Sequence, residues 1–152
     1  MKISDTEMIP MLVFEINKKE FGISVYSSHE VIIPPAITEM PNTPEFVLGI
    51  INLRGTIISI IDMRKLFNFP APPMTTSKII LVNIHNIPIG IIVDTVHEVV
   101  KINKAKIEPI PSIANWEGNK NCLIGIAKEE TRMITLLNLN NILSKEQLKI
   151  FK

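Results

Sequence analysis

The side chains best suited to chemistry in this 152-residue chain are three histidines and one cysteine. His29, His85 and His97 are far apart in the sequence, and none has a second His or Cys at a metal-binding spacing. Cys122 lies in an apolar segment typical of a buried, inert thiol, and a single cysteine excludes an internal disulfide. The sequence has no glycine-rich phosphate loop and no nucleophile elbow. We therefore expect no enzyme activity, no catalytic residue, no metal and no cofactor.

Charge and hydropathy exclude two further classes of function. Lys and Arg number 16 and Asp and Glu 15, giving a net charge of +1 without a block of like charge. This balance disfavours a surface that binds nucleic acid or acidic membrane by bulk electrostatics. No apolar run approaches the roughly 18 to 20 residues of a membrane helix, and the first residues lack the apolar core of a signal peptide. We expect a soluble, cytoplasmic protein without direct membrane insertion.

One charged residue stands next to the most apolar stretch of the chain. Residues 57–61 read Ile-Ile-Ser-Ile-Ile, a composition typical of a buried strand, and Arg54 precedes them. Gly55 fits a tight turn because a residue without Cβ adopts positive φ at no steric cost. A cation at this place requires a partner or a function. Glu30, at the end of an earlier strand-like segment, is the candidate partner on a neighbouring strand.

Two interpretations of the Arg54 and Glu30 pair stay open at this point. A cross-strand ion pair on an exposed surface contributes about 0–1 kcal/mol to stability. A pair that forms part of a partner-binding surface matters more, because loss of one member of a desolvated pair costs roughly 2–5 kcal/mol of binding free energy. Both interpretations can hold together.

An internal repeat defines the expected architecture. The segment 49–67 aligns without a gap on 125–143, and 16–32 aligns on 84–100, with the tripeptide His-Glu-Val at 29–31 and again at 97–99. Both halves contain short strand-like segments separated by turn residues. We predict an all-β fold of two similar, five-stranded barrels, because closing each sheet removes its free edges.

The boundaries of the parts follow from composition. We predict a first barrel lobe over 11–68, a proline-rich linker over 69–77, a second barrel lobe over 78–143, and a C-terminal helix over 144–152. Ser144 and Gln147 have the spacing of a capping box at the start of that helix. A short helical turn is expected over 45–48. Trp116, alone in the long loop 103–121, is interpreted as a cover for the core.

The chain resembles the chemotaxis coupling protein family CheW from about Met11 to Leu143. The resemblance rests on three blocks in the family's order: Met40 to Gly55, which contains Pro-Asn-Thr-Pro and G-x-x-N-L-R-G elements and is followed by the apolar strand and Asp62-Met63-Arg64, then Gly90 to Asp94, and Gly125 to Ala127. It implies a CheW-like fold of two packed five-stranded barrels, SH3-like or OB-like, with a short C-terminal helix.

The resemblance also implies a function and its residues. CheW proteins are non-catalytic adaptors that join the regulatory domain of the histidine kinase CheA to the cytoplasmic tip of chemoreceptors. By motif, Glu30 and Arg54 match the family's charged pair near the receptor and kinase surfaces. Gly49, Asn52 and Leu53 match the turn that shapes these surfaces. The expected location is cytoplasmic, in membrane-bound receptor arrays reached through these partners.

Three alternatives remain at this stage. Residues 32–35, Ile-Ile-Pro-Pro, depart from many chemotaxis members, which have a basic residue, a glycine and an aromatic after the glutamate, and look closer to paralogues serving twitching, type IV pilus or other chemosensory pathways. A small barrel that binds a ligand or works as an enzyme through Cys122 or a histidine is a second alternative. A barrel that binds nucleic acid is the third, disfavoured by charge and scarce aromatics.

Overall fold

The computed structural model describes residues 7–70, 76–111 and 120–151, which form ten strands and two short α-helices. The strands are β1 Met8–Ile16, β2 Lys19–Ser24, β3 Ser28–Ile32, β4 Val47–Leu53, β5 Thr56–Asp62, β6 Lys78–Ile84, β7 Ile87–Val93, β8 Thr95–Asn103, β9 Leu123–Glu129 and β10 Arg132–Leu137. The helices are α1 Met63–Leu66 and α2 Lys145–Lys149, and short 3-10 turns are η2 Val25–Ser27, η3 Lys104–Lys106, η4 Lys120–Cys122 and η5 Leu139–Asn141.

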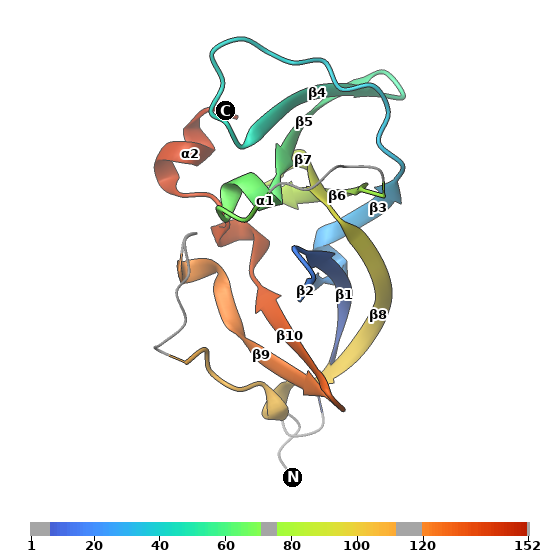
Figure 1. Ribbon diagram of the computed structural model, residues 1–152, viewed down its shortest axis with the longest axis vertical. Coiled ribbons are helices and arrows are strands. Elements are labelled where there is room, and N and C mark those ends of the chain that lie inside the picture. The colour runs from blue at the N-terminus through green and yellow to red at the C-terminus, as the bar shows by residue number, and fades with distance from the viewer. Residues whose placement is uncertain (1–6, 71–75, 112–119, 152) are drawn as a thin grey trace.

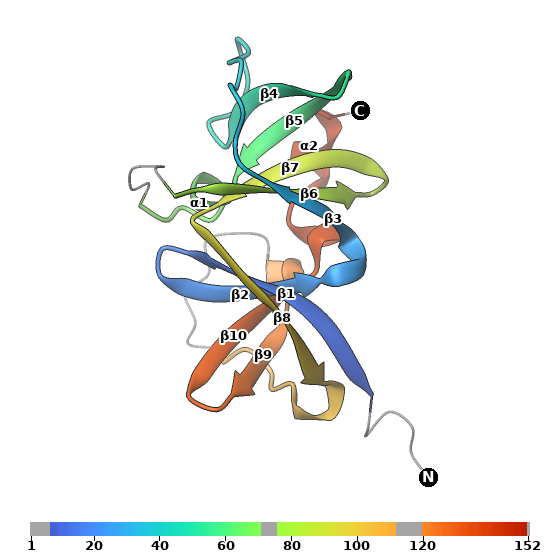
Figure 2. The same cartoon turned by 90° about the vertical axis from the view of Figure 1, so that its right-hand side faces the viewer.

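The strands make two five-stranded sheets, each curled into a barrel (Figures 1 and 2). We call the sheet of order β3-β6-β7-β5-β4 the central barrel, because its strands are consecutive in the chain. The sheet of order β8-β1-β2-β10-β9 is the terminal barrel, because it joins strands from both ends of the chain. The prediction of an all-β fold with two five-stranded sheets and a short C-terminal helix is confirmed.

The repeat seen in the sequence is also a repeat in the structure. Strands β1 to β5 correspond in order to β6 to β10, and this correspondence converts the strand order of one barrel into that of the other. Even the register agrees: Ser59 pairs with Ile89 in the parallel β5–β7 contact, and the equivalent Thr135 pairs with Phe21 in the parallel β10–β2 contact. The two barrels are therefore related by an internal pseudo-symmetry.

The predicted lobes 11–68 and 78–143 need correction. Each barrel combines the first hairpin of one half with the last three strands of the other half, so the halves are interleaved. The predicted linker 69–77 lies between α1 and β6, which belongs to the same sheet as β5, so it does not connect the two barrels. Within it, residues 71–75 lie outside the described residues. The crossings between barrels occur instead at η2 and at Asp94. Because both halves have the same alternation of apolar residues, the sequence pattern is identical for separate and for interleaved barrels.

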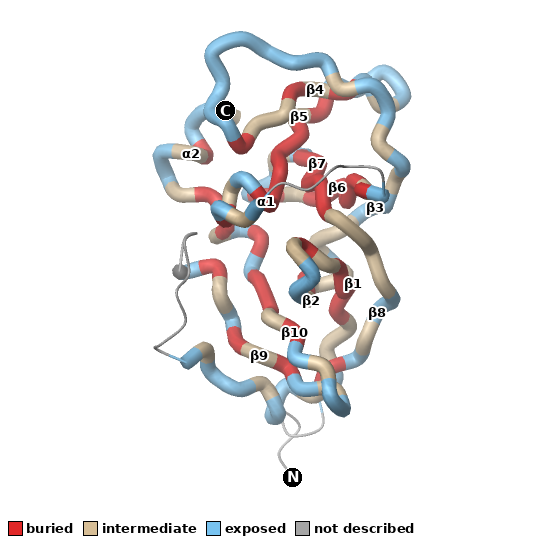
Figure 3. The backbone as a smooth tube through the Cα atoms, in the orientation of Figure 1, coloured by how far each residue is buried: buried red, intermediate tan, exposed pale blue. Residues whose placement is uncertain are grey.

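The buried apolar side chains of the described residues form three hydrophobic clusters, and Figure 3 shows the buried residues along the strands. One small cluster, including Val13 and Ile134, lies within the terminal barrel, and another, including Ile60 and Ile79, lies within the central barrel. The largest cluster draws on both barrels and on the segment after β10, with Phe14, Phe67 and Leu148 among its members. A large apolar interface of this kind disfavours independent motion of two units.

The chain termini and turns test the remaining local predictions. The capping box is confirmed: Ser144 Oγ accepts from the Gln147 amide at 3.1 Å, and the Ser144 amide donates to Gln147 Oε1 at 2.8 Å. The helix itself covers Lys145–Lys149, shorter than the predicted 144–152. The helical turn predicted over 45–48 is wrong, because β4 already begins at Val47. Trp116 lies outside the described residues.

Candidate protein-interaction surface

Arg54 and Glu30 meet at the end of the central barrel. Arg54 Nη2 donates to Glu30 Oε1 at 2.7 Å, and Nη1 donates to Oε2 at 3.4 Å. The two side chains are 69% and 38% exposed. Glu30 lies on β3 and Arg54 in the β4–β5 turn, although β3 and β4 are the opposite edges of the sheet. The sequence predicted that the two residues lie on neighbouring strands. In the structure the curling of the sheet brings its opposite edges, and with them the two residues, together.

The turn that carries Arg54 has a defined conformation. Arg54 and Gly55 have φ of 49° and 88°, the two left-handed residues of a type I′ hairpin between Leu53 and Thr56. The Asn52 Oδ1 atom accepts a hydrogen bond from the Gly55 amide at 2.9 Å, which stabilises the turn. Leu53 is partly buried against the core of the central barrel. These contacts fix the position from which the arginine side chain extends.

Gly49 shapes the same hairpin at its other end. It has φ of 145°, and a Cβ atom built on it would lie 2.1 Å from the Thr38 carbonyl oxygen. The close approach allows Thr38 and Ile50 to exchange two backbone hydrogen bonds of 2.9 Å each, which cover the edge of β4. Glycine is required here because any other residue would push the 38–39 segment away from the strand.

The charge pair is reinforced electrostatically. The hydrogen bond from Arg54, together with its charge, holds the pKa of the Glu30 carboxyl below its usual range. The same hydrogen bond and the negative charge of Glu30 raise the pKa of Arg54. Glutamate and arginine are ionised at neutral pH at their usual pKa values, and the two shifts widen the pH range over which the pair stays charged.

The strands next to this pair also carry exposed apolar side chains. Ile57 is paired in register with Asn52 and is 61% exposed, and Val31, the residue after Glu30, is also exposed. Exposed aliphatic side chains beside an accessible arginine are a composition suited to protein binding. The structure thus brings Glu30, Arg54, Asn52 and Leu53 together at one end of the central barrel, whereas Gly49 lies at the other end of the β4–β5 hairpin. The role of these residues in binding stays a prediction.

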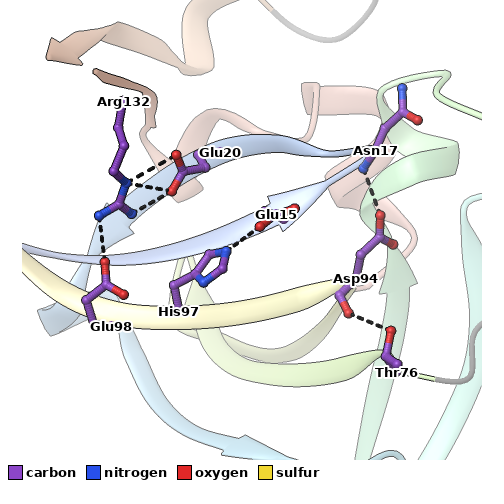
Figure 4. Close-up of polar contacts among 8 residues, drawn as sticks. All are labelled: Glu15, Asn17, Glu20, Thr76, Asp94, His97, Glu98 and Arg132. Carbon is purple, nitrogen blue, oxygen red and sulfur yellow. Dashed lines mark hydrogen bonds and ion pairs between the residues drawn. The ribbon is translucent and has the colours of Figure 1, made fainter. Parts of the chain in front are cut away.

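The terminal barrel has a counterpart that the sequence comparison missed. Glu98, the equivalent of Glu30, accepts from Arg132 Nη1 at 2.9 Å, and Arg132 Nε donates to Glu20 Oε1 at 3.0 Å (Figure 4). The hydrogen bond from Arg132 lowers the pKa of Glu98. Arg132 lies two positions beyond the residue that aligns with Arg54, Glu130, so a position-by-position comparison could not identify it. Searching for any arginine near the end of the second hairpin would have found it.

The exposed apolar residues also repeat. Val99 and Met133 are the equivalents of Val31 and Ile57, and both are exposed, Met133 at 61%. Each barrel end therefore presents a glutamate, an arginine and two aliphatic side chains. The charges differ, since the terminal barrel adds Glu20 to the arginine.

The remaining chemically capable side chains do not converge. His29 is exposed, the His85 ring contacts the Asn140 carbonyl, and the His97 ring contacts the Glu15 carboxylate (Figure 4). Cys122 is buried, as its apolar segment predicts, and lies at the end of η4. Within 7–70, 76–111 and 120–151, no group of three His, Cys, Asp or Glu side chains is arranged to hold a metal.

A cavity of about 200 Å³ opens into the terminal barrel. It is lined mainly by aliphatic side chains, among them Ile9, Ile107 and Leu136, with Ser24 at its rim. The repeat equivalent of Ser24 in the central barrel is Ile92, which is fully buried. The two halves therefore differ in side-chain size and polarity at this position.

The two packed five-stranded barrels have the architecture of a protein of the scaffold class. The chain belongs to the CheW-like domain family, whose model matches residues 10–147. This is a family of chemotaxis coupling and scaffold proteins, not a family of enzymes. Among the described residues, none of the helices has the length and hydropathy needed to cross a membrane.

Individual relatives agree with this assignment. The chain is 32% identical to the chemotaxis protein CheW of Helicobacter pylori over 141 residues, which cover 92% of this chain and 84% of the relative. It is 31% identical to CheW of Bacillus subtilis over 137 residues, covering 90% and 87%. The crystal structure of the scaffolding protein TtCheW from Thermoanaerobacter tengcongensis superposes with a TM-score of 0.84 at 36% identity, covering 93% of this chain and 96% of that one.

Proposed function

We propose that this chain is a non-catalytic adaptor that couples chemoreceptors to the histidine kinase CheA in a bacterial chemosensory array. Membership of the CheW family supports the adaptor class. The observation that carries the proposal is the Arg54–Glu30 pair, accessible and held in place by a structured turn at the end of the central barrel. An ion pair this exposed contributes little to the free energy of unfolding, which favours a role in binding over a purely structural one.

The proposed site consists of Glu30 and Arg54 as charged contacts, with Asn52, Leu53 and Gly49 shaping the hairpin and Gly55 its turn. The partners are the regulatory domain of CheA and the cytoplasmic tip of the receptors. The chain would reside in the cytoplasm and reach the membrane only through these partners. Because it touches both, the signal would pass through differential contacts of the receptor in its two signalling states.

A related pathway is the second candidate. The segment after Glu30 carries the strongly exposed Ile33 followed by Pro34 and Pro35, in place of the basic residue, glycine and aromatic of many chemotaxis members. This segment supports a paralogue that serves a twitching, type IV pilus or other chemosensory array. A ligand-binding barrel or a nucleic-acid-binding barrel has less support, since the titratable groups are dispersed and the net charge is only +1.

Calorimetric titration with the isolated CheA regulatory domain tests the site. We expect Arg54→Ala to weaken binding by about 30-fold or more, the lower end of the cost of losing one member of an interfacial charge pair, while the melting temperature changes little. Lys65→Ala, which removes an exposed cation from α1, is the matched control and should bind as the wild type does.

A charge swap separates the two interpretations of the pair. The double variant with Glu30→Arg and Arg54→Glu retains an internal ion pair but exchanges the charges that face a partner. Restored binding in this variant would show that the pair acts only within the chain, contrary to the proposed site. Continued loss of binding with an unchanged melting temperature is the expected result.

A further inference from the structure

Asp94 lies at the point where the chain passes from one barrel to the other. It directly follows β7 of the central barrel and directly precedes β8 of the terminal barrel. Its amide donates to the Glu15 carbonyl at 3.0 Å, and its Oδ2 accepts from the Asn17 amide at 2.7 Å. Figure 4 shows the side chain directed toward Asn17, with Thr76 near its backbone. The crossing residue is thus tied to the first hairpin of the terminal barrel.

The same carboxylate faces the central barrel. Asp94 Oδ1 lies 3.1 Å from Arg64 Nη1, an ion pair without the alignment of a hydrogen bond. Arg64 belongs to α1, its side chain is fully buried, and its Nε lies 3.3 Å from Asp62 Oδ1 at the end of β5. Charged side chains are rarely buried this completely unless they are paired. One carboxylate therefore connects an interior cation of the central barrel to a turn of the terminal barrel.

The pseudo-symmetry places a second contact between the barrels at the equivalent position. Asn17 and its equivalent His85 both have left-handed φ, 54° and 49°, at the start of a hairpin turn. The His85 amide donates to Asn140 Oδ1 at 3.0 Å, and Asn140 is the equivalent of Arg64. The His85 amide therefore donates directly to the side chain of Asn140. The Asn17 amide donates instead to Asp94, and Asp94 in turn pairs with Arg64.

We propose that Asp94 is a positioning residue that fixes the angle between the two barrels, so that one chain holds its two partners at the same time. The second part of this statement rests on the proposed adaptor function. Within the described residues, the hydrogen bonds and ion pairs of Asp94 join it to Glu15, Asn17, Arg64 and Thr76, and none of these joins it to Glu30, Arg54 or Arg132. Its replacement should leave each barrel end intact and change only their relative orientation.

The first test uses this chain alone. Spin labels on the exposed sites Thr56→Cys and Thr131→Cys report the separation of the two barrel ends by pulsed electron resonance, and the native Cys122 is buried. We expect Asp94→Ala to shift or broaden the distance distribution. Thr76→Ala, which removes only a 3.5 Å contact to the Asp94 backbone carbonyl, is the matched control and should leave the distribution unchanged.

The second test measures binding by unlabelled protein. We expect Asp94→Ala to bind the CheA regulatory domain or a receptor tip fragment alone within about twofold of wild type, and to weaken the ternary complex at least about fivefold, the lower end of common coupling between sites. If Asp94→Ala does not fold, Asp94→Asn replaces it, because the amide keeps an acceptor for Asn17 and removes only the charge facing Arg64.

The outcomes separate the two proposals. An unchanged distance distribution in the folded variant, or equal weakening of binary and ternary binding, would overturn the role of Asp94. Wild-type protein that binds neither partner would overturn the adaptor function instead, and the distance measurement would still decide whether Asp94 sets the angle between barrels.

Discussion

Gly49 gives the most quantitative test of how the site is built. In Gly49→Ala, the new Cβ would lie 2.1 Å from the Thr38 oxygen and 2.8 Å from its carbonyl carbon, so the 38–39 backbone must move. The movement would break the two hydrogen bonds between Thr38 and Ile50, each worth about 0.5–1.5 kcal/mol. Left-handed backbone adds about 1–2 kcal/mol for a residue with a Cβ. We expect a total loss of about 2–5 kcal/mol in the free energy of unfolding.

Gly55→Ala is the matched control, because its Cβ would meet nothing within 4 Å and only the φ of 88° is unfavourable. This variant should lose about 1–2 kcal/mol. Urea denaturation followed by circular dichroism measures both, provided that the slope with denaturant is unchanged. If Gly49→Ala is no less stable than Gly55→Ala, the close approach to Thr38 does not constrain the hairpin and the reasoning is refuted.

Three further predictions concern charge and packing. In Arg54→Ala the pKa of Glu30, measured by carbon-13 NMR, should rise toward its usual value, and an unchanged pKa would contradict the pairing. Because the pKa of Glu30 is lowered in the folded state, the stabilisation by the pair is fully present above the usual value near 4.5 and is lost as the pH falls below it. Arg132→Ala should lower the free energy of unfolding by about 1 kcal/mol, more than Arg54→Ala, because Arg132 bonds both Glu20 and Glu98; equal losses by urea denaturation would count against this network. Ser24→Val should gain about 0.5–1 kcal/mol by filling part of the cavity but lose about 0.5–2 kcal/mol with the hydrogen bond that Ser24 Oγ accepts from the Tyr26 amide at the start of η2, so we expect no rise in melting temperature; a clear rise would show that this cap contributes little.

The sequence predicted the elements of the fold and their repetition, but not how the halves are combined. The gapless alignment kept Gly49 in phase with Gly125, and both prove to be sites where a neighbouring carbonyl approaches the strand. Local pattern determines which side chains face the core. Whether a hairpin pairs with its own half or with the other half depends on contacts between segments distant in the chain, which a local pattern does not encode.

The site was predicted in part for a similar reason. Arg54 was recognisable because a fixed cation beside an apolar strand requires a partner, and the structure supplies Glu30. The Arg132 network escaped detection, because its arginine is displaced by two residues and its second partner, Glu20, lies on a strand of the other half. Arg64 and Asp94 are separated in the sequence by β6 and β7 as well as by a loop, and only the three-dimensional structure brings them together.

Kinase activity in a reconstituted mixture tests the adaptor account most directly. Receptor fragments, CheA and ATP are combined with and without this protein, and phosphorylation of CheA is followed over time. The account predicts that the protein raises kinase activity only when receptor is present, and that Arg54→Ala abolishes the increase. Activity that is the same with and without the wild-type protein, although both partners are functional with another CheW protein, would contradict it.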